Sequence, residues 1–206
     1  MSEQQSNLDK VYSVGSGAAL QRHYDQWADS YDDELAANDY RTPARGAEAL
    51  ARHCADKSLP VLDFACGTGL SGVALHAAGF SCIDGTDVSP GMLEQARAKG
   101  VYRALLPAGL DAPPDVTGAG YGAITAIGAI GTGAAPASCI DWALESLQPG
   151  GLFVVSLNDH TLEDPDYMDR VTGAEAAGKV AILEAKQGPH LPALGLGARV
   201  FVLQRR

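Results

Sequence analysis

The sequence is poor in the features that mark metal-binding, secreted, membrane and nucleic-acid-binding proteins. Its 4 cysteines have no metal-ligand spacing, so we expect reduced, buried thiols rather than a zinc site or disulfides. No apolar run approaches the roughly 18 residues of a membrane span, and the first residues lack a signal-peptide pattern. Basic residues are scarce, with 15 Lys and Arg against 25 Asp and Glu, and form no stripe. We expect a cytoplasmic protein with no metal, no membrane partner and no nucleic-acid partner.

What the sequence does contain is an alternation of strand-like and helix-like segments. A chain of 206 residues with 46% hydrophobic residues can bury a proper core within one domain. Alternating segments joined by short connections are typical of a doubly wound α/β sheet. Thr42 and Ser138 are expected to cap helices that begin just after them, and Ser89 to cap a third. The expected strands are 61–64, 80–87, 101–106, 121–127 and 152–157, followed by 179–186 and 198–203, which are joined by a loop containing His190.

The most informative stretch is residues 61–72, where a strand-like run leads into a glycine-rich turn and then a helical pattern. Glycine lets the backbone approach a ligand closely because it has no Cβ. The spacing Gly67-x-Gly69-x-x-Gly72 also fits a dinucleotide site, with Asp87 near the acidic position expected about 20 residues further on. Asp63 separates the two interpretations. A pyrophosphate at a helix N-terminus prefers positive potential, so a carboxylate before the turn favours a cationic ligand instead.

Residues 62–69 resemble the first motif of class I S-adenosylmethionine-dependent methyltransferases, and residues 85–93 resemble a second block of the same family. The resemblance extends from about residue 16 to residue 206 and is closest to the methyltransferase-domain proteins related to the Williams–Beuren-region methyltransferase-like group. It implies a Rossmann-like sheet of seven strands, mostly parallel, whose last strand is antiparallel. It also implies S-adenosylmethionine as the cofactor.

The same resemblance implies the cofactor-binding residues. Asp63 and the backbone of the turn would hold the methionine moiety, and Asp87 would accept hydrogen bonds from the ribose hydroxyls. Relatives place an Asp at the adenine, where this chain has Gly109, so backbone groups of Gly109 and Leu110, or the neighbouring Asp111, would serve instead. The remaining implied contacts come from the turn, the second block and the loop beside the sulfur: Ala65, Gly67, Thr68, Gly69, Val88, Met92 and Gly128.

The N-terminal part is predicted to form an arm and a helical lid. From residue 16 to about residue 37, Tyr24, Trp27 and Tyr31 recur on one face of a helical pattern. These aromatics could simply pack on the domain, but the resemblance implies that they close over the methionine end of the cofactor. Arg41 could pair with the cofactor carboxylate or lie on the surface. The acids Asp25, Asp29, Asp32 and Asp33 are expected to be solvated. The chain thus divides into residues 1–57, the arm and lid, and residues 58–206, the cofactor-binding domain, within one globular unit.

The expected activity is methyl transfer to a small-molecule acceptor by in-line displacement, in which alignment in a dry pocket supplies most of the rate. His160 is the best-placed candidate base, after the fifth strand and over the expected acceptor cavity, although a histidine in such a place is more often a surface residue. Two other functions stay open: a catalytically silent S-adenosylmethionine-binding module, and a NAD(P)-dependent oxidoreductase. A monomer or a homodimer is expected.

Overall fold

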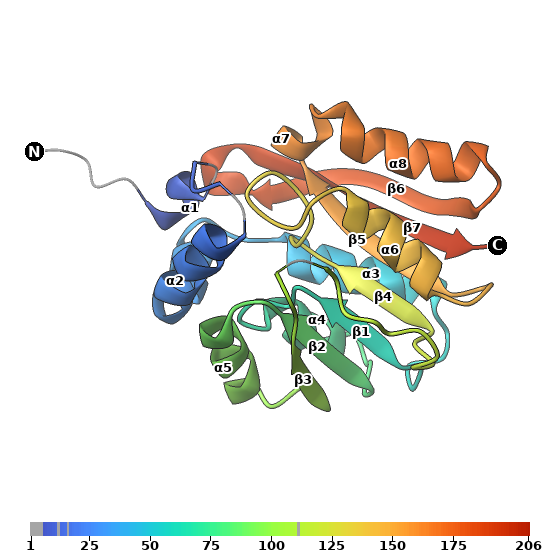
Figure 1. Cartoon of the computed structure of the whole chain (residues 1–206), viewed down its shortest axis with the longest axis horizontal. Coiled ribbons are helices and arrows are strands. Elements are labelled where there is room, and N and C mark those ends of the chain that lie inside the picture. The colour runs from blue at the N-terminus through green and yellow to red at the C-terminus, as the bar shows by residue number, and fades with distance from the viewer. Residues whose placement is uncertain (1–5, 12, 16, 111) are drawn as a thin grey trace, which may run out of the picture.

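The computed structural model describes residues 6–11, 13–15, 17–110 and 112–206, and within them seven strands form one sheet in the order β3-β2-β1-β4-β5-β7-β6 (Figure 1). Strand β1 pairs in parallel with β2 and β4, while β7 is antiparallel to β5 and to β6. The prediction of a mostly parallel, doubly wound sheet with an antiparallel last strand is confirmed. The strands are β1 Val61–Phe64, β2 Ile83–Asp87, β3 Ala104–Pro107, β4 Ala123–Ala126, β5 Leu152–Asn158, β6 Val180–Leu191 and β7 Leu196–Arg205.

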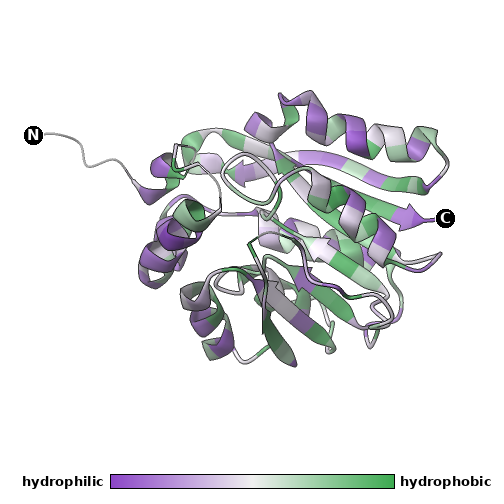
Figure 2. Cartoon of the chain, viewed as in Figure 1, coloured by the Kyte–Doolittle hydropathy of each residue, from purple (hydrophilic) through white to green (hydrophobic). Residues whose placement is uncertain are grey.

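Helices cover both faces of this sheet. On one face Leu50 and Leu75 pack against Val61, and on the other Ile140 and Val171 pack against the side of the sheet that carries Leu62. Neighbouring strand residues point to opposite faces, so a strand covered on both sides is mostly apolar. Figure 2 shows the hydrophobic colour on the strands and hydrophilic colour along α2 and α8. The helices are α1 Asn7–Lys10, α2 Ala18–Ala37, α3 Thr42–His53, α4 Leu70–Ala77, α5 Pro90–Ala98, α6 Ser138–Ser146, α7 Asp159–Leu162 and α8 Pro165–Ala176.

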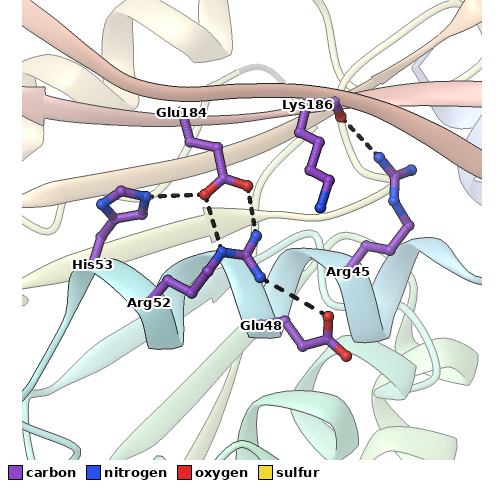
Figure 3. Close-up of polar contacts among 6 residues, drawn as sticks. All are labelled: Arg45, Glu48, Arg52, His53, Glu184 and Lys186. Atoms are coloured by element: carbon purple, nitrogen blue, oxygen red, sulfur yellow. Dashed lines mark hydrogen bonds and ion pairs between the residues drawn. The ribbon is translucent and has the colours of Figure 1, made fainter.

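Helix α3 belongs to the packed core, although the sequence prediction grouped it with the lid. Its Ala49 and Leu50 are completely buried against the sheet. Figure 3 shows how its polar side fastens the hairpin of β6 and β7. Arg52 donates to both carboxylate oxygens of Glu184, at 3.1 and 2.5 Å, while Arg45 donates to the backbone carbonyls of Lys186, Pro189 and Ala198 at 2.8 to 3.0 Å. The planar guanidinium group of arginine presents several N–H donors in a fixed arrangement, which suits contacts with two acceptors at once.

Three local predictions were wrong. Thr42 does not cap α3, because it is already the first helical residue and its hydroxyl lies 2.7 Å from Nδ1 of His190. Ser138 is likewise inside α6, which has Ala137 at its N-cap. His190 is not in a loop, since strand β6 continues to Leu191. No helix in the described part of the chain is both long and apolar enough to cross a membrane.

Candidate functional site

A tight bend connects β1 to α4 at the carboxyl ends of the strands. Ala65, Gly67 and Gly69 have φ angles of 50°, 55° and 91°, the left-handed region that L side chains rarely adopt. A Cβ placed on Gly67 would meet no atom within 4 Å, so the backbone of the bend presents an open face. The amide of Cys66 donates to the Thr86 carbonyl at 2.9 Å, which ties the bend to β2. The bend can therefore receive a ligand against its backbone.

Asp87 ends β2 and faces this bend directly. Its Oδ2 accepts from the amide of Gly67 and its Oδ1 from the amide of Ser89, both at 2.9 Å. A carboxylate offers about four lone-pair positions. Each oxygen of Asp87 therefore keeps acceptor capacity after these bonds, which suits two hydroxyl donors of a ribose. Burial raises the pKa of Asp87, and the backbone amides of Ser89 and Gly67 oppose that rise.

Asp63 lies behind the bend rather than in front of it. The side chain is 0% exposed, and it accepts hydrogen bonds from the hydroxyls of Ser71 at 2.6 Å, Tyr102 at 2.7 Å and Thr125 at 2.9 Å. Burial raises its pKa to about 6, although the three hydroxyls lower it. In this conformation Asp63 contacts hydroxyl groups of the protein and no open space. Its predicted contact with a methionine ammonium stays a prediction.

Helix α2 lies along α5 and covers the residues next to Asp87. Asp25 accepts from the Ser89 hydroxyl at 2.5 Å and from the Gly91 amide at 3.1 Å. Asp32 accepts from the Thr68 hydroxyl at 2.5 Å and pairs with Lys99 at 2.5 Å. The expectation that these acids are solvated was wrong for Asp25 and Asp32, which are partly buried. Asp29, which accepts from the Gln95 side-chain amide at 2.9 Å, and Asp33 are exposed as expected. Carboxylates at the N-terminus of α5 complement its dipole.

The covered residues include others expected at the cofactor. The carbonyl of Val88 accepts from Gln21 of α2 at 2.6 Å. Met92 is 1% exposed, beneath this contact layer, and Thr68 is also 1% exposed. Thr68, Val88 and Met92 thus lie close to Asp87 but under the lid helix.

A cavity of about 70 Å³ opens between the lid and the ends of β4, β5 and β6. The predicted lid residues Tyr24, Trp27 and Tyr31 line it, as does Gly128, where a Cβ would lie 2.2 Å from the Tyr40 hydroxyl. Rings of Trp27 and Tyr31 meet edge to face with centroids 4.6 Å apart. Burial raises the pKa of Tyr31, and the charges of Tyr40, Tyr24, Asp87 and Asp32 add to the rise.

Several residues of this cavity wall were not predicted from the sequence. They are Tyr40, Ser156 and His190, together with apolar side chains from the arm, α2 and β6: Leu8, Val11, Leu35 and Leu191. His190 is 8% exposed and comes from the end of β6, whereas His160 is exposed on α7 and is not among the lining residues. The only sequence signal for His190 was its place in the closing hairpin.

The remaining predicted residues lie outside the cavity wall. Arg41 is exposed and pairs with Asp39 at 2.7 Å. Gly109 and Leu110 are exposed in the loop after β3, whose residue Ala108 donates to the Asp87 carbonyl at 2.8 Å. Asp111 lies outside the described residues. The structure therefore brings Asp87 and the bend together, and it brings the lid aromatics and Gly128 together, while Arg41 and His160 join neither group.

Comparisons with known proteins agree with this arrangement. Residues 61–151 match the family model described as a methyltransferase domain. Methyltransferase-like protein 27 of Homo sapiens is 36% identical over 159 residues, which are 73% of this chain and 62% of that protein; the chain thus spans less than two thirds of its length.

Two solved structures share the fold at low sequence identity. A chain from the complex of the Haloferax volcanii Trm112 methyltransferase activator has a TM-score of 0.61 at 19% identity, covering 91% of this chain and 98% of that one. A geranyl diphosphate methyltransferase in complex with SAM has a TM-score of 0.57 at 12% identity, covering 79% of this chain and 85% of that one. These likenesses concern the fold, which alone does not specify an activity.

Proposed function

The chain carries a methyltransferase domain of the class I S-adenosylmethionine-dependent type, and from this premise we propose that it transfers a methyl group from S-adenosylmethionine to a small-molecule acceptor. The observation that carries the proposal is the pairing of Asp87 with the open backbone of Gly67. In open α/β sheets ligands bind beyond the carboxyl ends of strands, where the strand order reverses. Here that point lies between β1 and β4.

The residues present fit the cofactor. Gly67 leaves room for a ligand against the backbone, and the spare acceptor positions of Asp87 match a pair of ribose hydroxyls. The proposal assigns Ala65, Gly69 and Thr68 to the bend around the methionine end, Val88 and Met92 to the adenosine side and Gly128 to the loop beside the sulfur. When bound, the cofactor supplies an electrophilic methyl group. The chain supplies alignment and a wall of aromatic rings that excludes water.

A small acceptor is supported by the position and lining of the cavity, which lies under the lid and is walled mainly by apolar, aromatic and small residues. The structural neighbour titled geranyl diphosphate methyltransferase gives a parallel for such an acceptor. The proposal also includes a cytoplasmic location and a monomeric or dimeric state. Within residues 1–57 the arm and α2 form the lid, while α3 packs with residues 58–206 as part of the catalytic unit. Free thiols at all 4 cysteines are consistent with a reducing compartment.

Calorimetric titration of the full chain with S-adenosylmethionine, S-adenosylhomocysteine, NAD and NADP tests the cofactor. We expect the two adenosyl ligands to bind and the two dinucleotides not to bind. Asp87→Ala should weaken S-adenosylmethionine binding at least about 100-fold, because it removes charge-assisted acceptors that both hydroxyls need. Asp115→Ala, at an exposed acid whose oxygen bonds the Thr117 amide, is the matched control and should bind as the parent does. Unchanged affinity in Asp87→Ala would remove this residue from the site.

A second measurement separates an enzyme from a silent binding module. The chain is incubated with methyl-labelled S-adenosylmethionine and a cell extract divided by ultrafiltration into small molecules and proteins. We expect label in the small-molecule fraction, with equimolar S-adenosylhomocysteine. Label confined to the protein fraction would exclude the small-molecule acceptor, and binding without any product in either fraction would favour the silent module.

A further inference from the structure

The cavity wall carries no formal charge. Among the described residues that line it there is no Asp, Glu, Lys or Arg, while Tyr24, Trp27, Tyr31 and Tyr40 supply flat aromatic surface. A charged ligand would lose its hydration here without gaining a partner of opposite charge. The wall therefore suits a neutral molecule with an apolar, flat body.

One polar atom in this wall lacks a partner. Trp27 is 2% exposed, and its indole Nε1 has no hydrogen-bond partner within the part of the chain that the structure describes. An indole N–H is a donor only, and a buried donor without an acceptor is destabilising. The other tryptophan, Trp142, donates its Nε1 to the Pro114 carbonyl at 3.1 Å. An acceptor oxygen supplied by a bound ligand would satisfy this buried donor.

A second polar group, His190, is aimed by the backbone. The pairing of β6 with β7 shifts register between Pro189 and Leu191, so His190 is the extra residue of a β-bulge. Bulges redirect a side chain out of the regular alternation and recur next to active sites. The start of α3 fixes this bulge: the Arg41 amide donates to the His190 carbonyl at 3.0 Å, and Arg45 holds the Pro189 carbonyl at 2.9 Å.

The imidazole itself is held by one of its two nitrogens. Nδ1 lies 2.7 Å from Oγ1 of Thr42, and Nε2 has no hydrogen-bond partner among the described residues. The ring edge packs against Tyr40 with centroids 5.3 Å apart. A hydroxyl oxygen can accept the Nδ1 proton, which leaves the lone pair of the ring on Nε2.

We propose that this cavity takes an uncharged, flat molecule bearing a hydroxyl group, whose oxygen accepts from Trp27 and whose proton passes to Nε2 of His190. The inference rests on the proposed methyl transfer and names its acceptor class. The acceptor oxygen uses a lone pair to form the new O–CH₃ bond, the S–CH₃ bond breaks with its electrons going to sulfur, and the hydroxyl proton ends on His190. The products are a methyl ether, S-adenosylhomocysteine and an imidazolium.

The charges around His190 are consistent with this role. The pKa of His190 is lowered to about 4, mainly by burial and also by Arg45 and His160, while Asp159 opposes the shift. The imidazole is therefore neutral at pH 7 and has a lone pair to accept a proton.

The binding part of the proposal is tested on the full chain by NMR, which shows the indole N–H signals of Trp27 and Trp142 separately. The probes are 4-methylphenol, the anionic 4-methylbenzoate and the cationic 4-methylbenzylamine, each with and without S-adenosylhomocysteine. We expect 4-methylphenol alone to shift the Trp27 signal, with the Trp142 signal unchanged as an internal control. A Trp27 signal that no probe moves, or that the charged probes move as much, would overturn the proposal.

The proton-accepting part is read from the ring nitrogens of His190. With ¹⁵N-labelled histidine, 4-methylphenol should move the Nε2 resonance, whereas 4-methylanisole, which has no hydroxyl, should leave it in place. His190→Gln should keep 4-methylphenol affinity within about 3-fold but lower methyl transfer at least about 100-fold, the usual size of a general-base effect. His76→Gln, on the exposed side of α4, is the matched control and should change neither.

The outcomes distinguish this inference from the proposed function. If S-adenosylmethionine binds but Nε2 does not respond to the hydroxyl, the acceptor assignment is wrong and the cofactor assignment stands. If His160→Gln abolishes transfer while His190→Gln does not, the base lies on α7 and the role of His190 is overturned. If S-adenosylmethionine fails to bind, the methyl-transfer proposal fails, and the probe shifts still decide what the cavity accepts.

Discussion

Asp63 shows how one residue can couple a ligand-binding bend to the interior of the sheet. Its carboxylate has no exposed surface and is satisfied only by hydroxyl groups. Tyr102, one of the donors, also accepts the Gly72 amide at 3.1 Å, so the same cluster holds the first turn of α4. Neutral donors stabilise the ionised form less than a cationic partner would, which is why burial dominates and the pKa rises to about 6.

This environment predicts a pH-dependent stability. Because the folded pKa of about 6 lies above the ordinary 3.8, Asp63 contributes stability that is fully present below pH 3.8 and is lost as the pH rises through 6. Between pH 5 and pH 8 this loss is about 1.4 kcal/mol, and Asp63→Asn should not suffer it. Urea unfolding at both pH values measures the difference.

The comparison variant is Glu145→Gln, which alters an exposed carboxylate on α6 in the same way. Its free energy of unfolding should follow that of the parent at both pH values. A pH dependence shared equally by the parent and Asp63→Asn would show that Asp63 keeps an ordinary pKa in the folded chain.

At the scale of elements, the lid helix is held mainly at the N-terminus of α5. Asp25 accepts from both the Ser89 hydroxyl and the Gly91 amide, and so acts as a capping carboxylate supplied by another helix. Losing such a contact costs about 0.5–2 kcal/mol. We therefore expect Asp25→Ala to speed hydrogen exchange of α2 amides about 2- to 30-fold, with the β1 and β4 amides unaffected.

Asp33→Ala is the control for this prediction, since it removes an acid of the same helix that is exposed rather than docked. Its exchange rates should match those of the parent. If Asp25→Ala exchanges as slowly as Asp33→Ala does, then the aromatic face, and not the carboxylate, holds the lid in place.

The two helical glycines of α4 and α8 predict opposite effects of the same substitution. A Cβ on Gly72 would lie 2.2 Å from Cζ of Tyr102, whereas on Gly173 it would meet no atom within 4 Å. Gly72→Ala should therefore lower the free energy of unfolding by about 1–3 kcal/mol through overpacking. Gly173→Ala should raise it by about 0.5–1 kcal/mol, because alanine restricts the unfolded chain more than glycine does. Thermal unfolding of both variants measures the sign; a loss in Gly173→Ala would refute the argument.

The ends of helices and strands were predictable where a few neighbouring residues determine them. Ser89 caps α5 as expected, since its hydroxyl accepts from the Met92 amide three residues later. Thr42 has the same composition signal, but its hydroxyl is taken by His190, which is 148 residues away in sequence. The bulge that aims His190 depends on the register of two strands, and no short window of sequence contains that information. The same limit applied to the acids of α2, whose partners lie on α5.

At the scale of the whole molecule, the site has one part that the sequence pattern predicts and another part that only the packing of distant segments creates. Gly67 and Asp87 follow consecutive strands of a parallel sheet, so the alternation of strands and helices was enough to predict that they meet, and the structure bonds them. The cavity wall is assembled from the arm, α2, the loop after β4 and the hairpin of β6 and β7. These pieces are brought together only by the packing of α2 and α3, which explains why Tyr40 and His190 were not predicted.

This division predicts how the chain tolerates truncation. Helix α2 adds the buried side chains of Trp27 and Leu35 to a separate cluster over the cavity, whereas α3 contributes Leu50 to the main core. A chain of residues 38–206 should therefore keep a single cooperative urea transition while losing the cavity.

A chain of residues 58–206 loses α3, which uncovers Val154 and Val202 and removes the hydrogen bonds of Arg45 to the hairpin of β6 and β7. Since a domain has a net stability of only about 5–15 kcal/mol, losing a core helix should prevent folding. Circular dichroism and size-exclusion chromatography of both chains decide the matter: a folded 58–206 chain would place α3 with the lid after all, and an unfolded 38–206 chain would make the lid part of the core.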